Sequence, residues 1–396
     1  MRRLALTEYR RAAFPALPAG SARALHATTG VQVSSTLGGA RTILQARSTV
    51  GAVRVGLGAD CVELQIRPKV GVSRLLWLLG HARDQSGWRE DDVEIGTETG
   101  LVAAMAVMFT ARCRRALAAG VLRGYEEREE TRPGLRGRLR EADQMRARPG
   151  LPLPLEVRFD DYTINIPENR VLRTAAIRLL GLSDVSPLVR MALTRLNREL
   201  AEADALAPGT PTPQITLTRL NRRYAPALHI ARFVLERTSV EYTHGAQSAT
   251  GFLFDMNHVF EDWLTTALTV ALETRSGTVH SQRPLILDED SGVTMQTDMT
   301  WSSGADCLAV IDAKYKRLQQ AGPRSEDVYQ VLAYCTALGI RSGHLVYAAG
   351  GPPRVLTVRN SGVRVHTHVI SLNAPRDRIL TSVDSVATEI AASIGR

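Results

Sequence analysis

The stretch Cys307-Leu308-Ala309-Val310-Ile311-Asp312-Ala313-Lys314-Tyr315 decides the fold of the carboxyl-terminal part of the chain. Its apolar, partly β-branched opening predicts a strand, on which successive side chains point to opposite faces. Asp312 and Lys314 therefore lie side by side on one face, at the end of an otherwise apolar strand. Burying a carboxylate and an ammonium near a core is unfavourable unless each has a partner or a metal. The strand thus indicates a functional site.

Asp298 is the expected third member of this site, because it lies near the end of the preceding predicted strand, Val293–Trp301. Two carboxylates that converge on one point form a hard-oxygen site suited to Mg²⁺, with Mn²⁺ as an alternative ion. A lysine beside them can orient or help deprotonate a water, or neutralise charge developing on a phosphate. An Asp-x-Lys pair on a strand edge is also common as a solvated ion pair, so that interpretation stays open.

Two helices expected around these strands each add a polar residue. Glu261 lies in the helix Asn257–Glu273, beside its apolar stripe, where it can face a site instead of water. Gln330 and Tyr334 are four residues apart in the helix Ser325–Leu338 and share one face. A glutamine on a largely apolar helix needs a hydrogen-bond partner, which a phosphate or an active-site residue could supply. Taken alone, Glu261 and Gln330 are equally compatible with partly exposed helix positions.

The chain of 396 residues is too long for one ordinary domain, and we expect an α+β multidomain protein. Residues 1–95 are expected to form a β-rich domain, residues 96–245 a mainly helical domain with a β-hairpin, and residues 246–396 an α/β domain. The main boundary is placed in the polar, aperiodic segment Thr238–Ala249.

The elements expected before this boundary are strands and helices of moderate length. Strands are expected at Ala24–Gln32, Arg41–Gly56, Cys61–Ile66 and Leu155–Phe159, the last followed by a turn at Asp160-Asp161. Helices are expected at 73–81 with Ser73 as cap, at 97–130 from Thr97 or Thr99, from Pro167, and near 187–205 and 216–237. Beyond the boundary, further strands are expected at Thr278–Leu287 and His344–Tyr347.

The charge balance indicates a polyanionic partner. The formal net charge is +9, and of the 49 basic residues only three are lysines, Lys69, Lys314 and Lys316. A genome-level preference for arginine codons explains most of this bias. Two of the three lysines nevertheless fall within one pentapeptide, which suggests a position where the forked arginine head will not serve.

The cysteines and the amino terminus favour a reduced, cytoplasmic setting. The four cysteines are scattered without a C-x-x-C pair, so they predict neither a zinc site nor a disulfide framework. The first residues meet a charge too early for a signal peptide, and the longest apolar stretch, Leu101–Phe109, is far too short for a membrane span.

Four ordered segments carry a family resemblance. They are Phe260-Glu261-Asp262, Gln296-Thr297-Asp298, Ile311-Asp312-Ala313-Lys314-Tyr315-Lys316 and Asp327-Val328-Tyr329-Gln330-Val331-Leu332-Ala333-Tyr334. This set resembles the PD-(D/E)XK nuclease domain and is most similar to the McrC subunit family of the McrBC modification-dependent restriction systems. The Gln-x-x-x-Tyr spacing also resembles the RecB-like branch of that superfamily. Weaker landmarks of the same family lie upstream: Ser48–Gly51, Ile66–Lys69, Gly134–Arg138 and Glu168–Leu172.

The resemblance implies a restriction-endonuclease-like fold for residues 246–396 and Mg²⁺-dependent cleavage of double-stranded DNA. It implies that Asp298, Asp312 and Glu261 bind metal, that Lys314 acts in catalysis and that Gln330 supports the site. It also implies a partner, an McrB-like AAA+ GTPase ring, on which the amino-terminal half docks and whose nucleotide hydrolysis it stimulates. The chain contains no P-loop Gly-x-x-x-x-Gly-Lys-Ser/Thr, so it is not itself the motor.

One departure and two alternatives remain. The family usually has proline before the first catalytic aspartate, where this chain has Thr297. That change is the one feature in favour of a non-catalytic activator or scaffold of an AAA+ ring. A stand-alone RecB-like repair nuclease is the second alternative, against which the large amino-terminal region speaks. Arg136, Arg138 and Arg140 would share a strand face in an extended segment and could contact phosphate or the ring, or form a solvated basic hairpin.

Overall fold

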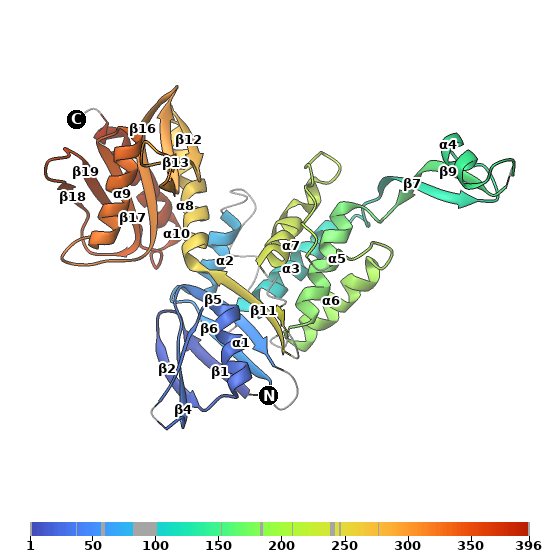
Figure 1. The fold of residues 1–396 in the computed structure, drawn as a ribbon, viewed down its shortest axis with the longest axis horizontal. Coiled ribbons are helices and arrows are strands. Elements are labelled where there is room, and N and C mark those ends of the chain that lie inside the picture. Colours follow the sequence, from blue (N-terminus) through green and yellow to red (C-terminus); the bar gives the residue numbers. More distant parts are fainter. Residues whose placement is uncertain are drawn as a thin grey trace. The chain divides into compact units, whose positions relative to one another are not determined.

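The protein is a mixed α+β chain with several sheets. The computed structural model describes residues 2–36, 38–56, 60–81, 101–151, 153–182, 185–207, 209–237, 242–244, 247–275 and 277–394. Its contacts divide the chain into two compact units (Figure 1). The first comprises 1–99, 242–249 and 253–396, and the second comprises 100–241 and 250–252. The division into three domains stays a prediction.

The amino-terminal part of the first unit contains two sheets and two helices. A five-stranded sheet has the order β1-β6-β5-β11-β10, and a three-stranded sheet has the order β2-β4-β3. The elements are β1 (Arg2–Thr7), β2 (Arg11–Pro15), α1 (Ala19–Thr29), β3 (Gln32–Ser35), β4 (Arg41–Gln45), β5 (Thr49–Val55), β6 (Val62–Arg67), α2 (Val72–His81), β10 (Tyr242–His244) and β11 (Gln247–Asp255).

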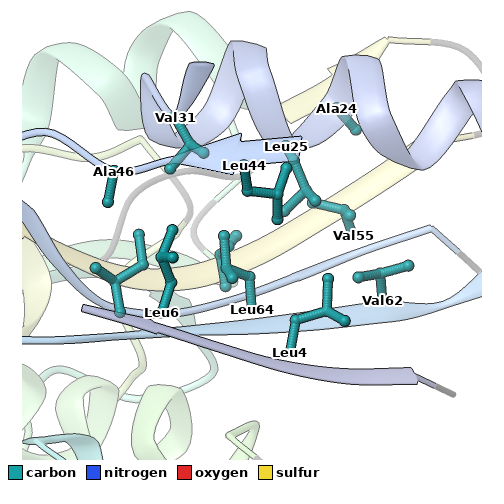
Figure 2. Packing of buried hydrophobic residues seen from close by; sticks show 12 residues of the cluster. Leu4, Leu6, Ala24, Leu25, Val31, Leu44, Ala46, Val55, Val62 and Leu64 are labelled. Carbon is teal, nitrogen blue, oxygen red and sulfur yellow. The ribbon is translucent and has the colours of Figure 1, made fainter. Parts of the chain in front are cut away.

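A hydrophobic core joins the sheets to α1. Leu4 of β1 and Leu64 of β6 belong to the same buried cluster as Leu25 of α1 and Leu44 of β4 (Figure 2). Removing such side chains from water supplies about 25 cal/mol per Å² of apolar surface, which is the main term that stabilises this part of the chain.

The strand expected at Ala24–Gln32 is wrong, since residues 19–29 form α1. The helical segment is rich in alanine, which favours a helix. Gly30 then ends the helix in the left-handed region, at φ 64°, and its N–H bonds the His26 carbonyl. The strand at Cys61–Ile66 is confirmed as β6, whereas Ser73 lies inside α2 and not at its cap. The expected start of the next helix, at Thr97 or Thr99, lies outside the described residues.

The second unit combines a helical bundle with a charged ladder of strands. Figure 1 shows that the ladder extends away from the helices of this unit. The elements are α3 (Leu101–Leu117), β7 (Gly124–Arg132), β8 (Arg138–Leu139), α4 (Glu141–Ala147), β9 (Leu155–Thr163), α5 (Pro167–Leu180), α6 (Pro187–Glu199), the 3₁₀ turn Arg222–Tyr224 and α7 (Ala225–Arg237). The strand order in the ladder is β7-β9-β8.

Two expectations in this unit fail because strand pairing overrides local propensity. Helix α3 ends at Leu117, and the Glu- and Arg-rich residues 124–132 pair antiparallel with β9 instead of continuing the helix. The turn expected at Asp160-Asp161 is also wrong, because both residues continue β9 opposite β7. The helix from Pro167 is confirmed, while the two that follow are shorter than expected.

A six-stranded sheet organises the carboxyl-terminal part of the first unit, in the order β12-β15-β16-β17-β19-β18. Strands β16, β17 and β19 are parallel, and β15 runs antiparallel to β16. The elements are α8 (Met256–Glu273), β12 (Thr278–Ser281), β13 (Pro284–Ile286), β14 (Thr294–Gln296), β15 (Met299–Ser303), β16 (Asp306–Leu318), α9 (Ser325–Leu338), β17 (Ser342–Gly350), β18 (Arg354–Thr357), β19 (Arg364–Val369) and α10 (Arg376–Ser393).

Helices α8 and α9 cover opposite faces of this sheet. Phe260 of α8 packs against the ring of Tyr315 on β16, with ring centroids 6.1 Å apart. Gln330 of α9 contacts Lys314, the neighbour of Tyr315. Because neighbours on a strand point to opposite faces, β16 lies between the two helices. The helices and β16 appear where the sequence predicts them, but the expected strands at 278–287 and 293–301 are each split in two.

Gly343 allows α9 to lie close to the sheet. A Cβ atom at this position would be 2.2 Å from Cγ1 of Val331 and 2.9 Å from Sγ of Cys335, both on α9. Only glycine is therefore compatible with this approach of the helix to β17. Of the helices described, none has the length and apolarity needed to cross a membrane.

Candidate functional site

Asp312 and Lys314 are adjacent on the face of β16 that α9 covers. Nζ of Lys314 lies 2.5 Å from Oδ2 of Asp312 and donates to Oε1 of Gln330 at 2.8 Å. Asp312 is fully buried, and the side chain of Lys314 is only 16% exposed. The structure therefore brings together three of the five residues expected from the sequence, with the shared strand face that period two predicts.

Asp298 lies between β14 and β15, and not at the end of a continuous strand. Its Oδ2 accepts the backbone N–H of Ala313 at 2.8 Å, so the carboxylate sits beside the Asp312–Lys314 segment. Its own carbonyl accepts the N–H of Gln282 at 3.1 Å. The junction between the two short strands thus aims Asp298 at β16.

Glu261 reaches the site from α8 with the help of a residue that the sequence did not single out. Nε2 of Gln282 donates to Oε1 of Glu261. Gln282 has φ 53°, in the left-handed region that non-glycine residues seldom occupy. Since its N–H also donates to the backbone carbonyl of Asp298, this one residue connects the Glu261 carboxylate to the backbone that carries Asp298. No local sequence signal marks it, because a left-handed glutamine has no composition signature.

The carboxyl groups share a site where ionisation is unfavourable. Burial, and next the charge of Asp298, raise the pKa of Asp312 to about 7. Burial, and next the charges of Asp298, Asp262 and Asp312, raise the pKa of Glu261 to about 7. The pKa of Asp298 is also raised by burial, against the Ala313 hydrogen bond and the charge of Lys314. Like charges that crowd together favour either protonation or a bound cation.

Lys314 remains a cation in this setting. Burial lowers its pKa, but the charge of Asp312, the hydrogen bond to Asp312 and the charge of Asp298 together exceed that effect, so its pKa is raised. An ammonium held in this way supplies a fixed positive charge beside the carboxylates. It does not supply a base.

A chain of hydrogen bonds fixes the Gln330 amide. Its Nε2 donates to the hydroxyl of Tyr334 at 2.7 Å, and that hydroxyl donates to the carbonyl of Gln296 at 2.7 Å. The amide oxygen is thereby oriented toward Lys314, which satisfies the need for a partner expected from the sequence. The Gln-x-x-x-Tyr spacing thus connects α9 to the residues just before Asp298.

Thr297 replaces the proline usual in the family with two hydrogen bonds. Its N–H and its hydroxyl both donate to the carbonyl of Arg283, at 3.0 and 3.3 Å. Proline could make neither contact, since it lacks an N–H and a hydroxyl. The buried threonine therefore holds the backbone before Asp298 by hydrogen bonds in place of a fixed ring.

The oxygens present fit a hard divalent cation held by two carboxylates. Oδ1 of Asp312 is buried and makes no hydrogen bond, as expected for an atom that a cation would satisfy. Mg²⁺ commonly uses one or two carboxylates and keeps several waters. In the described ranges, no group of three His, Cys, Asp or Glu side chains is arranged to hold a metal. Direct ligation by Glu261 therefore stays a prediction.

The segment that carries Arg136, Arg138 and Arg140 is not one extended strand, which was the condition for a shared strand face. Only Arg138 lies in β8, while Arg136 pairs with Asp161 at 2.8 Å and Arg140 with Glu129 at 2.9 Å. Their acidic partners on β7 and β9 offset much of the positive charge.

Comparison with known proteins gives two kinds of match. The profile of the McrBC 5-methylcytosine restriction system component family matches residues 44–348. None of the curated proteins matches the chain. The fold is similar to a Thermococcus gammatolerans structure described as a half-complex from a tetradecameric assembly of McrB AAA+ hexamers with bound McrC. The TM-score is 0.62 at 17% identity, over 98% of this chain and 100% of that one. A second structure, of the McrBC complex of the same organism, has a TM-score of 0.45 at 19% identity, over 68% of this chain and 88% of that one.

Proposed function

The chain belongs to the McrBC 5-methylcytosine restriction system component family, and from that premise we propose that it is the Mg²⁺-dependent DNA endonuclease subunit of a modification-dependent restriction complex. The family is the one that the four motifs predict. The observation that carries the proposal is the convergence of Asp298, Asp312 and Lys314, with Gln330 hydrogen-bonded to the lysine.

In this proposal Asp298 and Asp312 hold the cation, and Glu261 is the further candidate ligand. The ion would supply positive charge that activates a water and neutralises the scissile phosphate. Lys314, which stays protonated, donates to a phosphate oxygen and stabilises the negative charge that develops there. Gln330 keeps the ammonium aligned through the hydrogen bonds to Tyr334 and Gln296.

The proposed partner is an McrB-like AAA+ GTPase ring, and the proposed substrate is double-stranded DNA. Support comes from the similarity in fold to the structure that contains McrB hexamers with bound McrC. In this proposal the amino-terminal half docks on the ring and stimulates its nucleotide hydrolysis. The carboxyl-terminal part, proposed to be a restriction-endonuclease-like domain, supplies the cutting site.

Reconstitution with an McrB-like ring tests the proposal. Methylated DNA, GTP and Mg²⁺ should give cleavage by the native chain and none by Asp312→Ala, while both chains bind the ring and stimulate GTP hydrolysis. Stimulation without cutting by the native chain would identify a non-catalytic activator. Cutting by the chain alone would identify a stand-alone nuclease, and cutting that persists in Asp312→Ala would contradict the site.

A further inference from the structure

Two lysines on β16 face three acceptors on the side of α9. Lys314 contacts Asp312 and Gln330, as described. Lys316, two residues further on, donates from Nζ to Oδ1 of Asp327 at 2.6 Å. Asp327 and Gln330 are three apart on α9 and therefore share one face of the helix. Each of the two ammonium groups therefore contacts its own acceptors.

Asp327 is a buried acid whose charge acts inside the site. Its side chain is only 4% exposed, and its second oxygen accepts the hydroxyl of Tyr347 on β17 at 2.8 Å. Lys316 is the cation paired with it, and is itself 29% exposed. A buried carboxylate that loses its cation attracts another cation, because an uncompensated buried charge is strongly unfavourable.

Lys314, on the same strand, is an alternative cation. Burial and the groups Asp312 and Asp298 have the largest effects on the pKa of Lys314. The negative charge of Asp327 raises this pKa further, so Lys314 and Asp327 interact. The sheet is also irregular here: the pairing of β16 with β17 shifts between Lys314 and Arg317. Such bulges redirect side chains and are frequent beside active sites.

We propose that Lys316 is a positioning residue. It forms the ion pair with Asp327 and thereby keeps the Lys314 ammonium on Asp312 and Gln330. The inference rests on the proposed nuclease function for its catalytic consequence, but the placement of Lys314 can be measured without cleavage. It accounts for the second lysine of the pentapeptide, which the metal site itself does not use.

The proposal predicts an asymmetry that an ordinary structural ion pair would not give. Lys316→Gln leaves Asp327 hydrogen-bonded to Tyr347 but without its cation, so Lys314 shifts toward it and cleavage falls roughly 10- to 100-fold. Asp327→Asn removes the competing charge, still accepts from Tyr347 and leaves a lysine that can reach water, so its effect is small. The double variant Lys316→Gln/Asp327→Asn should recover the rate of Asp327→Asn alone.

A matched control is Glu63→Gln. Glu63 has the same 4% exposure and lies 3.9 Å from Arg3 and from Arg54, in the amino-terminal sheet. It should leave the Lys314 ammonium on Asp312 and Gln330 even if it lowers stability. The proposal is wrong if Asp327→Asn is as damaging as Lys316→Gln, or if the double variant is no better than Lys316→Gln.

Lysine-selective ¹⁵N labelling gives the readout that does not need activity. The chain has only three lysines, and Lys316→Gln leaves two. The Lys314 Nζ signal, identified by its loss in Lys314→Arg, should move in Lys316→Gln and return in the double variant. A Lys314 signal that does not move in Lys316→Gln overturns the positioning role. If the signal moves as expected in Lys316→Gln but the native chain never cuts DNA, only the nuclease function is overturned.

Discussion

The β7–β9 ladder and strand β16 both carry acids and bases, but their surroundings differ. In the ladder, Arg158 contacts both Glu127 and Glu129, and the side chains of all three are at least 40% exposed. On β16, Asp312 is fully buried and has Lys314 as its contacting cation. Exposed pairs are screened by water and salt and contribute little individually. Buried pairs lack this screening, so each partner matters.

The exposed charges of the ladder and the buried charges of β16 therefore differ in how many charged partners each has. In the ladder, Arg128, Arg140 and Arg158 each lie within reach of two acids, so each keeps a partner when one acid is lost. At β16 the Lys314 ammonium contacts Asp312 and Gln330, the Lys316 ammonium contacts Asp327, and Oδ1 of Asp312 makes no hydrogen bond. Conservative substitutions should therefore have small effects in the ladder and large effects at β16.

The largest expected effect is on cleavage. Asp312→Asn removes a proposed metal ligand while keeping its size, and we expect cleavage by the reconstituted complex to fall roughly 100-fold or more. Glu129→Gln in the ladder should leave the rate unchanged, because Glu127 remains beside Arg158 and Asp143 remains beside Arg140. Initial rates on labelled DNA measure both. Equal losses in the two variants would remove the distinction between ladder and site.

The next effect is on stability, at two glycines. Gly343→Ala forces a Cβ against Val331 and Cys335 and should cost about 1–3 kcal/mol of unfolding free energy. Gly134→Ala, between β7 and β8, meets no atom within 4 Å and should be neutral. Denaturant unfolding measures both values. A neutral Gly343→Ala would mean that α9 does not need its close approach to the sheet.

The site and the ladder should respond oppositely to pH. The pKa of Asp312 is raised to about 7, so its stabilising contribution is complete below the ordinary carboxyl pKa and is lost as pH rises through about 7. A hydrogen bond from Arg148 lowers the pKa of Glu156 in the ladder. That contribution is present above the ordinary carboxyl pKa and is lost as pH falls through the lowered value.

Thermal melts of the metal-free chain test this opposition. The stability of Asp312→Asn relative to the native chain should increase as pH rises from 5.5 to 8. Glu156→Gln should be less stable than the native chain at neutral pH and should equal it only under acid conditions. Added Mg²⁺ should stabilise the native chain more at pH 8 than at pH 5.5, because protons compete with the ion. Parallel pH profiles for both variants would contradict the assigned directions.

The sequence predicted the site better than the amino-terminal fold, for a physical reason. Period two places Asp312 and Lys314 together on any strand, and the spacing of Gln330 and Tyr334 aligns them on any helix. The outcome at Ala24–Gln32 depends instead on where Gly30 ends a helix. The run 124–132 depends on a partner strand that follows more than twenty residues later. Local propensity favours the helix at the first segment but carries little information about the strand pairing of the second.

Contacts made across the fold were also beyond the sequence. Buried Glu8 accepts a hydrogen bond from the Tyr315 hydroxyl at 2.9 Å, although 307 residues separate them. Asp327 reads as an ordinary first-turn acid until Lys316 and Tyr347 are placed against it. Such partners are set by topology, which no spacing rule encodes.

The smallest expected effect concerns backbone strain, where ladder and site again differ. The ladder places glycine at its left-handed positions, Gly137 and Gly150, whereas the site uses Gln282. A left-handed conformation costs a residue with a side chain about 1–2 kcal/mol, a cost that persists where surrounding contacts fix it. Gln282→Gly should relieve this strain and raise the unfolding free energy slightly.

The same substitution should weaken the site, because it removes the side chain that holds Glu261. We expect a several-fold loss of cleavage together with unchanged or higher stability, which is the usual trade at a functional position. Gln282→Ala is the matched control, since it loses the same contact but keeps the strain, so its cleavage should match Gln282→Gly while its stability stays lower. If Gln282→Gly cuts as well as the native chain, the left-handed glutamine is incidental, and Glu261 reaches the site without it.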